Sequence, residues 1–417
     1  MDRPFLRQEA LPTLDLARLA DWLVGAGLQG GQVADVLGEF CRRLNAAGLR
    51  LARAHVSMST LHPLVRAYGY TWSRSTGSVE ASEFEHSDEV SEAWRRSPFN
   101  HMIETSTTRM RRRLTGPDAL LDYPVLAEFR AQGVTDWYAA IFDFGFRVDD
   151  RSASALGLVC SFSTDREGGF SETDITFLET ILPMLALTIK SIVSIQISRS
   201  LLATYLGRDA AERVFLGQVR RGSVLSTDAV LLFADLQGFT TLADAMPTTE
   251  LVSMLDDYLD AMTRPVEARG GQVLKFMGDG VLAVFALGTE GRAGTCRTAL
   301  EAAVAAQQEV ARLNRGRADA GQPGLVLDLA LHVGEVLYGN VGSATRLDFT
   351  VIGPAVNEAS RIEALCKELG RPVLVSEEFA EVALDCRDRL VSLGRHRLRG
   401  VSGERELFGL APEGGTT

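Results

Sequence analysis

Cysteine is scarce in this sequence, and its distribution does not suggest a cross-linked fold. The chain has 417 residues and only 5 cysteines, an odd number scattered along its length. A disulfide framework or a zinc site would show paired or clustered cysteines instead. The sequence therefore argues against both, and at this length it predicts two or three domains with ordinary hydrophobic cores.

The chain also lacks an excess of basic residues. Its net charge is −11 and its pI about 5.2, which argues against a nucleic-acid-binding surface. No basic segment followed by an apolar one opens the chain, so we expect no secretion signal. The most apolar helical stretch, residues 181–197, contains Lys190 and several serines and threonines. We interpret it as too short and too polar to span a bilayer, and we expect a cytoplasmic protein without a membrane partner.

One stretch combines features of a metal site and a phosphate site. Residues 229–240 read AVLLFADLQGFT: an apolar run of strand type ends at Asp235, a turn with Gly238 follows, and Phe239 and Thr240 begin a helical pattern. A carboxylate is an oxygen ligand for Mg²⁺, and turn amides at a helix start favour anions. Since a strand that ends in Asp before a turn is common, this stretch alone is weak evidence.

A second acid follows in a predicted hairpin. Residues 272–285 read QVLKFMGDGVLAVF, in which two apolar runs flank a turn of Gly and Asp. The hairpin places Asp279 at its tip and Lys275 on its first strand. If it lies beside the strand that ends at Asp235, the two carboxylates meet and could hold a pair of metal ions. Turn statistics alone favour a simple turn-forming role for Asp279.

Three blocks, FADLQGFT, KFMGDG and FTVIGPAVNEASR (residues 349–361), together resemble the catalytic domain of the class III nucleotidyl cyclases. The resemblance covers about residues 229–410, with the blocks in the family's order. It implies that the ribose 3′-hydroxyl of ATP attacks its own α-phosphate, yielding cyclic AMP and pyrophosphate. It also implies two divalent ions per site, and the sequence leaves open whether they are Mg²⁺ or Mn²⁺.

The resemblance gives the candidate residues their roles. Asp235 and Asp279 would bind the metal ions, with the backbone carbonyl of Leu236 as a further ligand. The residues of the turn expected to offer amides to the triphosphate are Leu236, Gly238, Phe239 and Thr240.

Two further cationic positions and an amide complete the expected site. Asn357 and Arg361 are four residues apart and share a helix face. They match the family's pair that orients the ribose and stabilises the transition state, for which a guanidinium fork is well suited. A surface ion pair of Arg361 with Glu358 or Glu363 is the alternative. Arg399, in RLRGVSG, stands where many family members carry a phosphate-binding lysine.

Base selection is expected to rest on Lys275 and Thr350. Adenine presents an acceptor at N1 and a donor amine, which a lysine donor and a hydroxyl acceptor complement. Guanylyl members typically carry Glu and Cys at these positions, so the pair favours ATP. Thr at position 350 resembles the class IIIb branch, some of whose members respond to bicarbonate. An ordinary β-branched strand residue is the alternative interpretation of Thr350.

The N-terminal half resembles a GAF-type sensory domain by its order of elements, with a PAS-like domain as the rival. Such a domain would enclose a small ligand, which the sequence does not identify. The expected elements are two helices within residues 14–47, strands at 52–60, 64–72, 137–146 and 155–163, a polar irregular segment at 82–114, and a closing helix at 170–200.

Several residues of this half have alternative interpretations. The histidines that could bind haem or a metal are His55, His62, His86 and His101. We favour ordinary strand and loop roles for them, a buried apolar role for Cys160, and a solvated charged face for the basic run 109–113. The closing helix carries a heptad-like apolar seam from Leu178 to Ile195. Its first part could cover the sensor's own sheet, and we interpret residues 192–202 as a dimer helix.

The predicted organisation is a lead-in (1–13), a GAF-like sensor (14–200), a coupling linker (201–225), a cyclase domain (226–412) and a tail (413–417). The cyclase domain is expected to be α+β, a ferredoxin-like βαββαβ palm with additions. Within it, residues 325–333 and 335–341 are expected to form two paired strands joined near Gly334, and residues 353–369 a helix.

In this family the site forms between two catalytic domains. Because the chain holds the full residue set in a single such domain, the resemblance implies a head-to-tail homodimer. The alternatives are a guanylate cyclase, an inactive cyclase-like module for nucleotide sensing or dimerisation, and a polymerase-like palm, which the acidic net charge opposes.

Overall fold

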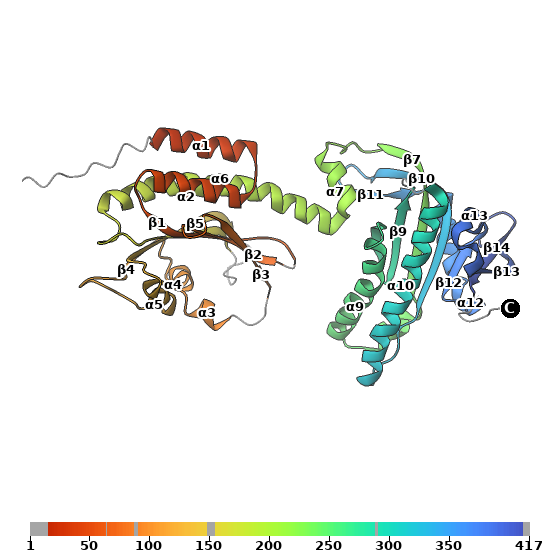
Figure 1. The fold of residues 1–417 in the computed structure, drawn as a ribbon. Coiled ribbons are helices and arrows are strands. Elements are labelled where there is room, and N and C mark those ends of the chain that lie inside the picture. Colours follow the sequence, from red (N-terminus) through yellow and green to blue (C-terminus); the bar gives the residue numbers. More distant parts are fainter. Residues whose placement is uncertain (1–15, 64, 87–90, 148–154, 288–290, 412–417) are drawn as a thin grey trace, which may run out of the picture. The chain divides into compact units, whose positions relative to one another are not determined.

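The computed structural model describes residues 16–63, 65–86, 91–147, 155–287 and 291–411. They form two compact units, Met1–Leu201 and Leu202–Thr417, here called unit 1 and unit 2 (Figure 1). The predicted lead-in and tail lie outside the described residues. The five cysteines are all free, as expected from their spacing. All five are also buried, as expected of Cys160.

Unit 1 is built on a six-stranded antiparallel sheet in the order β3-β2-β1-β6-β5-β4. Helices α1, α2 and α6 cover one face, and α4 and α5 cover the other, with α3 beside α4 (Figure 1). The strands are β1 (Leu51–Ser59), β2 (Val65–Ser73), β3 (Val79–Glu85), β4 (Arg109–Arg113), β5 (Asp136–Arg147) and β6 (Ala155–Thr164). The helices are α1 (Leu16–Gln29), α2 (Val33–Ala46), α3 (Glu92–Arg95), α4 (Pro98–Glu104), α5 (Pro124–Ala131) and α6 (Glu172–Leu206).

Side-chain alternation along β5 divides the two cores of unit 1. Tyr138 and Ala140 pack with α1, α2 and α6, whereas Trp137 and Ala139 pack with α4 and α5. The predicted helices and strands of this half are confirmed. The prediction that residues 82–114 are irregular is wrong, because they include part of β3 as well as α3, α4 and β4. Edge strand β3 is almost wholly exposed and therefore lacks an alternating apolar pattern.

The basic run is also not a solvated face. It forms β4, which pairs with β5. Arg111 Nη2 lies 2.8 Å from Asp136 Oδ2, and the Asp136 side chain is fully buried. Arg112 Nη2 lies 2.9 Å from Asp122 Oδ2. Both arginines neutralise acids of their own unit. For Asp136 the pairing is required, because a buried carboxylate must be paired.

Helix α6 is longer than predicted. It has 35 residues and an 18-residue window with a mean hydropathy of 1.7, so its length and composition alone would allow it to cross a membrane. The prediction that it is too short and too polar is therefore wrong. Its residues Leu178, Ile181 and Leu185 are buried in the core of unit 1, which accounts for much of the apolar character. Ile195, further along the predicted seam, is 49% exposed.

Unit 2 contains an eight-stranded sheet in the order β13-β14-β12-β10-β7-β9-β8, with β11 paired to β10. The strands are β7 (Val224–Leu236), β8 (Gln272–Met277), β9 (Gly280–Ala286), β10 (Leu327–Gly342), β11 (Leu347–Ile352), β12 (Val373–Ser376), β13 (Leu390–Arg397) and β14 (Glu404–Leu410). The helices are α7 (Arg208–Phe215), α8 (Phe239–Ala245), α9 (Thr248–Glu267), α10 (Gly291–Asp319), α11 (Pro354–Glu363), α12 (Cys366–Leu369), α13 (Glu377–Val382) and the 3₁₀ turn η1 (Leu384–Arg389).

The predicted palm is confirmed within this sheet. Strands β7, β8, β9 and β10, with α9 and α10 as crossovers, form a βαββαβ unit in the spatial order β10-β7-β9-β8. Figure 1 shows α9 and α10 side by side. They cover Val230 and Leu232 of β7, while Leu231 packs with α11 residues on the other face. Alternation places Asp235 on the face that α11 covers.

The prediction of two strands around Gly334 is wrong, because β10 is a single strand that pairs with β7 from Leu327 to Gly339. Gly334 does not form a turn; it allows α11 to pack closely against β10. A Cβ built there would lie 2.5 Å from the Cβ of Ala355 in α11, so only glycine lets this helix approach the strand. The predicted helix 353–369 is divided into α11 and α12.

Gly334→Ala should therefore destabilise unit 2, by about 1–3 kcal/mol as for other overpacked cores. Gly316→Ala is the matched control. Gly316 lies inside α10, where an added Cβ would meet nothing within 4 Å, and the change should stabilise by about 0.4–1 kcal/mol. Urea unfolding followed by far-UV circular dichroism measures both. Equal stability of the two variants would contradict the packing role of Gly334.

Candidate active site

The pairing of β7 with β9 brings Asp235 and Asp279 together. Ala234 pairs with Val281, and the hairpin closes where Met277 pairs with Gly280. A Cβ at Gly280 would lie 3.1 Å from Asp235 Oδ1. Glycine at this position therefore lets the hairpin backbone lie directly against the carboxylate. The predicted hairpin and the meeting of its tip with the end of β7 are confirmed.

The two carboxylates repel each other in a partly buried place. Burial, and then the nearby Asp279 carboxylate, raise the pKa of Asp235 to about 6. The backbone amide of Leu236 donates to Asp235 and acts in the opposite direction, and no cationic side chain contributes to this shift. Two oxygen donors that repel each other without a protein cation fit a divalent metal ion.

Two further carboxylates lie in the same electrostatic environment. Asp328 on β10 stands opposite Asp235 in the β7–β10 register. Glu363 ends α11, and its pKa is raised to about 7 by burial and by Asp235, Asp328 and Asp279. Sequence reasoning missed both. Asp328 reaches the site through the strand register and Glu363 through the path of α11, so neither residue belongs to a motif that is visible in the sequence.

Tyr258 of α9 lies close enough to these four carboxylates to interact with them electrostatically. The ring is fully buried, and its hydroxyl has no hydrogen-bond partner among the described residues. Burial raises the pKa of Tyr258, and the four carboxylates raise it further. The neutral phenol is therefore strongly favoured.

The predicted phosphate-binding turn directly follows Asp235. Gly238 adopts φ +77° and precedes α8, whose first residues are Phe239 and Thr240. The amides of a helix's first turn have no partner within the helix. The amide of Gln237 is used elsewhere, since it donates to the Val326 carbonyl at 2.9 Å.

Lys275 is held beside the strand that carries Thr350. Its Nζ lies 2.9 Å from Asp348 Oδ2, which ties β8 to β11. This lysine lowers the pKa of Asp348. Thr350 is two residues further along β11 and so on the same face. Sequence reasoning missed Asp348, although its position two residues before Thr350 is visible in the sequence.

Asn357 and Arg361 both lie exposed on α11. The alternative ion pairs of Arg361 are not observed among the described residues, and Glu358 instead lies 3.9 Å from Arg405 Nε. Within the described ranges, neither Asn357 nor Arg361 has a hydrogen bond or ion pair to Asp235 or Asp279. Arg399 is exposed in the turn after β13 and has no such contact in that part of the chain either.

Three of the four histidines considered as haem ligands have side chains that make hydrogen bonds within unit 1. His55 Nδ1 lies 2.9 Å from Thr71 Oγ1, and burial lowers the pKa of His55 to about 4. His62 Nδ1 accepts from the Val65 amide at 3.2 Å, and His86 Nε2 lies 3.0 Å from the His62 carbonyl. These bonds support the structural interpretation of the three residues.

A family model described as the adenylate and guanylate cyclase catalytic domain matches residues 225–411. Residues 225–411 are a class III nucleotidyl cyclase catalytic domain. The chain is 36% identical over 160 residues to an adenylate cyclase of Anabaena cylindrica, covering 37% of this chain and 31% of that one. It is 30% identical over 186 residues to adenylate cyclase 1 of Rhizobium meliloti, covering 43% and 27%. The matches thus span less than a third of these relatives.

Solved structures of cyclases also resemble part of this chain. The adenylyl cyclase CyaB from P. aeruginosa has 25% sequence identity and a TM-score of 0.42, covering 46% of this chain and 97% of that one. The guanylyl cyclase Cya2 has 27% identity and a TM-score of 0.40, covering 45% and 93%.

Asp235→Asn should stabilise the metal-free protein, because it removes the repulsion from Asp279. A carboxyl whose pKa is raised in the fold destabilises it above that pKa, and the effect disappears as pH falls below the unfolded value near 3.8. In EDTA we expect Asp235→Asn to raise the free energy of unfolding by about 1 kcal/mol at pH 7, a value that already allows for solvent screening. Near pH 4 the gain should be close to zero. Asp244→Asn, an exposed change in α8, is the control. An Asp235→Asn gain that does not vary with pH would contradict the repulsion.

Proposed function

We propose that this protein is an adenylate cyclase that converts ATP to cyclic AMP and pyrophosphate. The observation that carries the proposal is the meeting of Asp235 and Asp279 in a cyclase domain. The ion pair of Lys275 with Asp348, on the strand that carries Thr350, supports ATP over GTP. The test is production of cyclic AMP by the purified full-length protein with ATP and Mg²⁺ or Mn²⁺, against no product from the Asp279→Asn variant.

Asp235 and Asp279 would hold two divalent ions, and the backbone carbonyl of Leu236 would be a further ligand. When bound, such ions would promote ionisation of the ribose 3′-hydroxyl and offset the charge on the phosphates. The amides after Leu236 would orient the triphosphate by donating to its oxygens. Catalysis of this kind depends mainly on positioning and electrostatics.

Asn357 would orient the ribose, and Arg361 would donate two hydrogen bonds to phosphoryl oxygens as charge develops on them. Arg399 would bind the outer phosphates. All three side chains lie exposed and without contact to the acids in one chain, as described above. We therefore infer a head-to-tail homodimer, in which one chain supplies the acids and its twin supplies Lys275, Thr350, Asn357, Arg361 and Arg399.

The shared site predicts complementation between inactive chains. Asp235→Ala and Arg361→Ala should each abolish activity. A mixture of the two should recover up to about a quarter of the wild-type rate per chain, because random pairing gives half heterodimers with one intact site each. Mixing Asp235→Ala with Asp279→Ala is the control and should recover nothing, since both changes affect the same half-site. No recovery despite proven subunit exchange would contradict the shared site.

Asp348 constrains base selection, because the residue at position 275 must be compatible with its negative charge. Lys275→Glu with Thr350→Cys would introduce the residues typical of guanylyl members, but the new glutamate would face Asp348. We expect this double variant to lose ATP turnover and gain little with GTP. Adding Asp348→Asn should raise the GTP/ATP ratio of kcat/KM further, by up to about fivefold, since it removes a repulsion between two partly exposed carboxylates that is worth up to about 1 kcal/mol. An Asp348→Asn change without effect on that ratio would contradict the role of the ion pair.

Unit 1 is proposed to be a GAF-like sensor that regulates the cyclase domain. Its antiparallel six-stranded sheet with helices on both faces supports this assignment. Exposed Ile195 and Leu187 on α6 support a helix available for dimer contacts. Mass spectrometry of small molecules that copurify with the full-length protein would identify a bound ligand.

A guanylate cyclase and an inactive cyclase-like module are the remaining candidates. Lys275 opposes the first, since a cation does not complement the protonated N1 of guanine. The retention of both acids and of Asn357 and Arg361 opposes the second. Parallel assays with ATP and GTP distinguish all three.

A further inference from the structure

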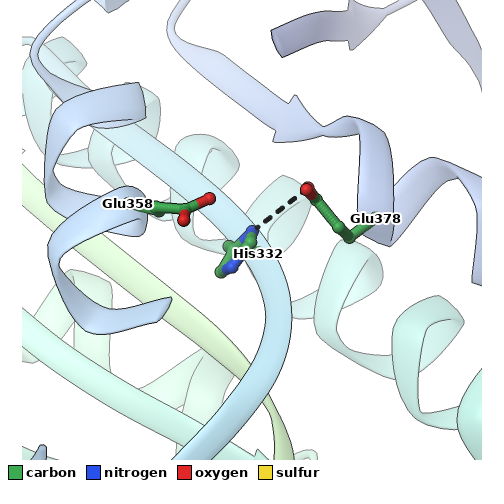
Figure 2. Close-up of side chains that lie close together, drawn as sticks. All are labelled: His332, Glu358 and Glu378. Carbon is green, nitrogen blue, oxygen red and sulfur yellow. Dashed lines mark ion pairs between the residues drawn. The ribbon is translucent and has the colours of Figure 1, made fainter. Parts of the chain in front are cut away.

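A second group of metal-ligating side chains lies in unit 2, apart from the acids at the end of β7. It consists of His332 on β10, Glu358 on α11 and Glu378 on α13, and their ligand atoms all lie within 4.8 Å of one another. Figure 2 shows the two glutamates approaching the imidazole from different helices. His332 Nδ1 lies 3.6 Å from Glu378 Oε2.

The fold fixes the imidazole of this cluster. His332 is buried on the face of β10 that α11 covers. Ser376 Oγ accepts from the Phe379 amide at 3.1 Å and lies 2.9 Å from His332 Nδ1. Since the hydroxyl already accepts one bond, its own proton is free to point at Nδ1. With the imidazole proton on Nε2, the lone pair of Nδ1 accepts from the Ser376 hydroxyl in the metal-free protein, and a metal ion at Nδ1 would take this lone pair in place of that hydrogen bond.

The charges of the cluster are incompletely compensated. Arg405 is the nearby cation, and its Nε lies 3.9 Å from Glu358 Oε2 and 3.7 Å from Glu378 Oε1. Both distances exceed a hydrogen bond. Arg405 Nε and Glu378 Oε2 are buried atoms without a hydrogen-bond partner in the described chain. The carboxylate lone pairs are therefore not used by the guanidinium.

We propose that His332, Glu358 and Glu378 bind one Zn²⁺ ion. Bonds of about 2.1 Å in a tetrahedral site place ligand atoms about 3.4 Å apart, close to the 3.6 Å between His332 and Glu378. One imidazole and two carboxylates match the His and Glu ligands of zinc sites with an open position for water. Mg²⁺ and Ca²⁺ prefer oxygen ligands alone and would be excluded. The ion would join α11, which carries Asn357 and Arg361, to β10 and α13.

Zinc titration of the full-length protein in excess Mg²⁺, followed by isothermal calorimetry, tests the site directly. We expect one Zn²⁺ per chain that Mg²⁺ does not displace. Glu358→Gln and Glu378→Gln should each weaken binding by more than about 100-fold, since even an outer-shell change costs 10–100-fold. Glu381→Gln, an exposed change on the same helix α13, should leave binding unchanged.

The double variant Asp235→Asn with Asp279→Asn should also keep this Zn²⁺, because its acids lie outside the cluster. Binding that is absent from the wild type, or retained in Glu378→Gln, or lost in the double variant, would overturn the proposal. Circular dichroism melts without metal establish that each variant is folded. Zn²⁺ should raise the melting temperature of the wild type, of Glu381→Gln and of the double variant, but not of Glu358→Gln or Glu378→Gln. Since no turnover is measured, failure here leaves the proposed cyclase activity unaffected, and the reverse also holds.

Discussion

The repulsion between Asp235 and Asp279 is the constraint on which the account of unit 2 depends. The β7–β9 pairing and Gly280 force the two carboxylates together, and burial keeps water from screening them fully. A fold maintains such an arrangement only if something else benefits from it. We propose that in this domain the benefit is a binding site for divalent cations.

Helix α11 connects the Asp235–Asp279 pair to the rest of the domain. Its side chains project in three directions. Asn357 and Arg361 face outward, Glu358 faces His332, and Glu363 lies near Asp235. The close approach of the helix to β10 at Gly334 fixes all of them at once. A small displacement of α11 would therefore change the outward pair and the buried acids together.

Most helices and strands and the hairpin at Asp279 were predictable from the sequence, and the palm topology from the family resemblance, whereas contacts between distant residues were not. The hairpin at Asp279 depends on neighbouring residues, and its position beside β7 follows from the palm topology. Gly334 misled the prediction because a turn and a tight helix contact both select glycine. Edge strand β3 was missed because a strand exposed to water lacks alternation. Arg111 looked like a surface charge because its partner Asp136 is 25 residues away.

The same distinction applies to the candidate site. Motif residues such as Lys275 were identified from the sequence, but its partner Asp348 requires β8 and β11 to be side by side. Asp328, Glu363 and the cluster at His332 depend on strand register and helix packing, which no single segment encodes.

The most direct measurement is electron paramagnetic resonance of Mn²⁺ bound to the full-length protein with 3′-deoxy-ATP, which cannot cyclise. The account predicts a pair of ions about 3.5–4 Å apart, seen as a spin-coupled signal that is lost in Asp279→Asn. Isolated, uncoupled Mn²⁺ in the wild type, or a coupled signal that persists in Asp279→Asn, would contradict it.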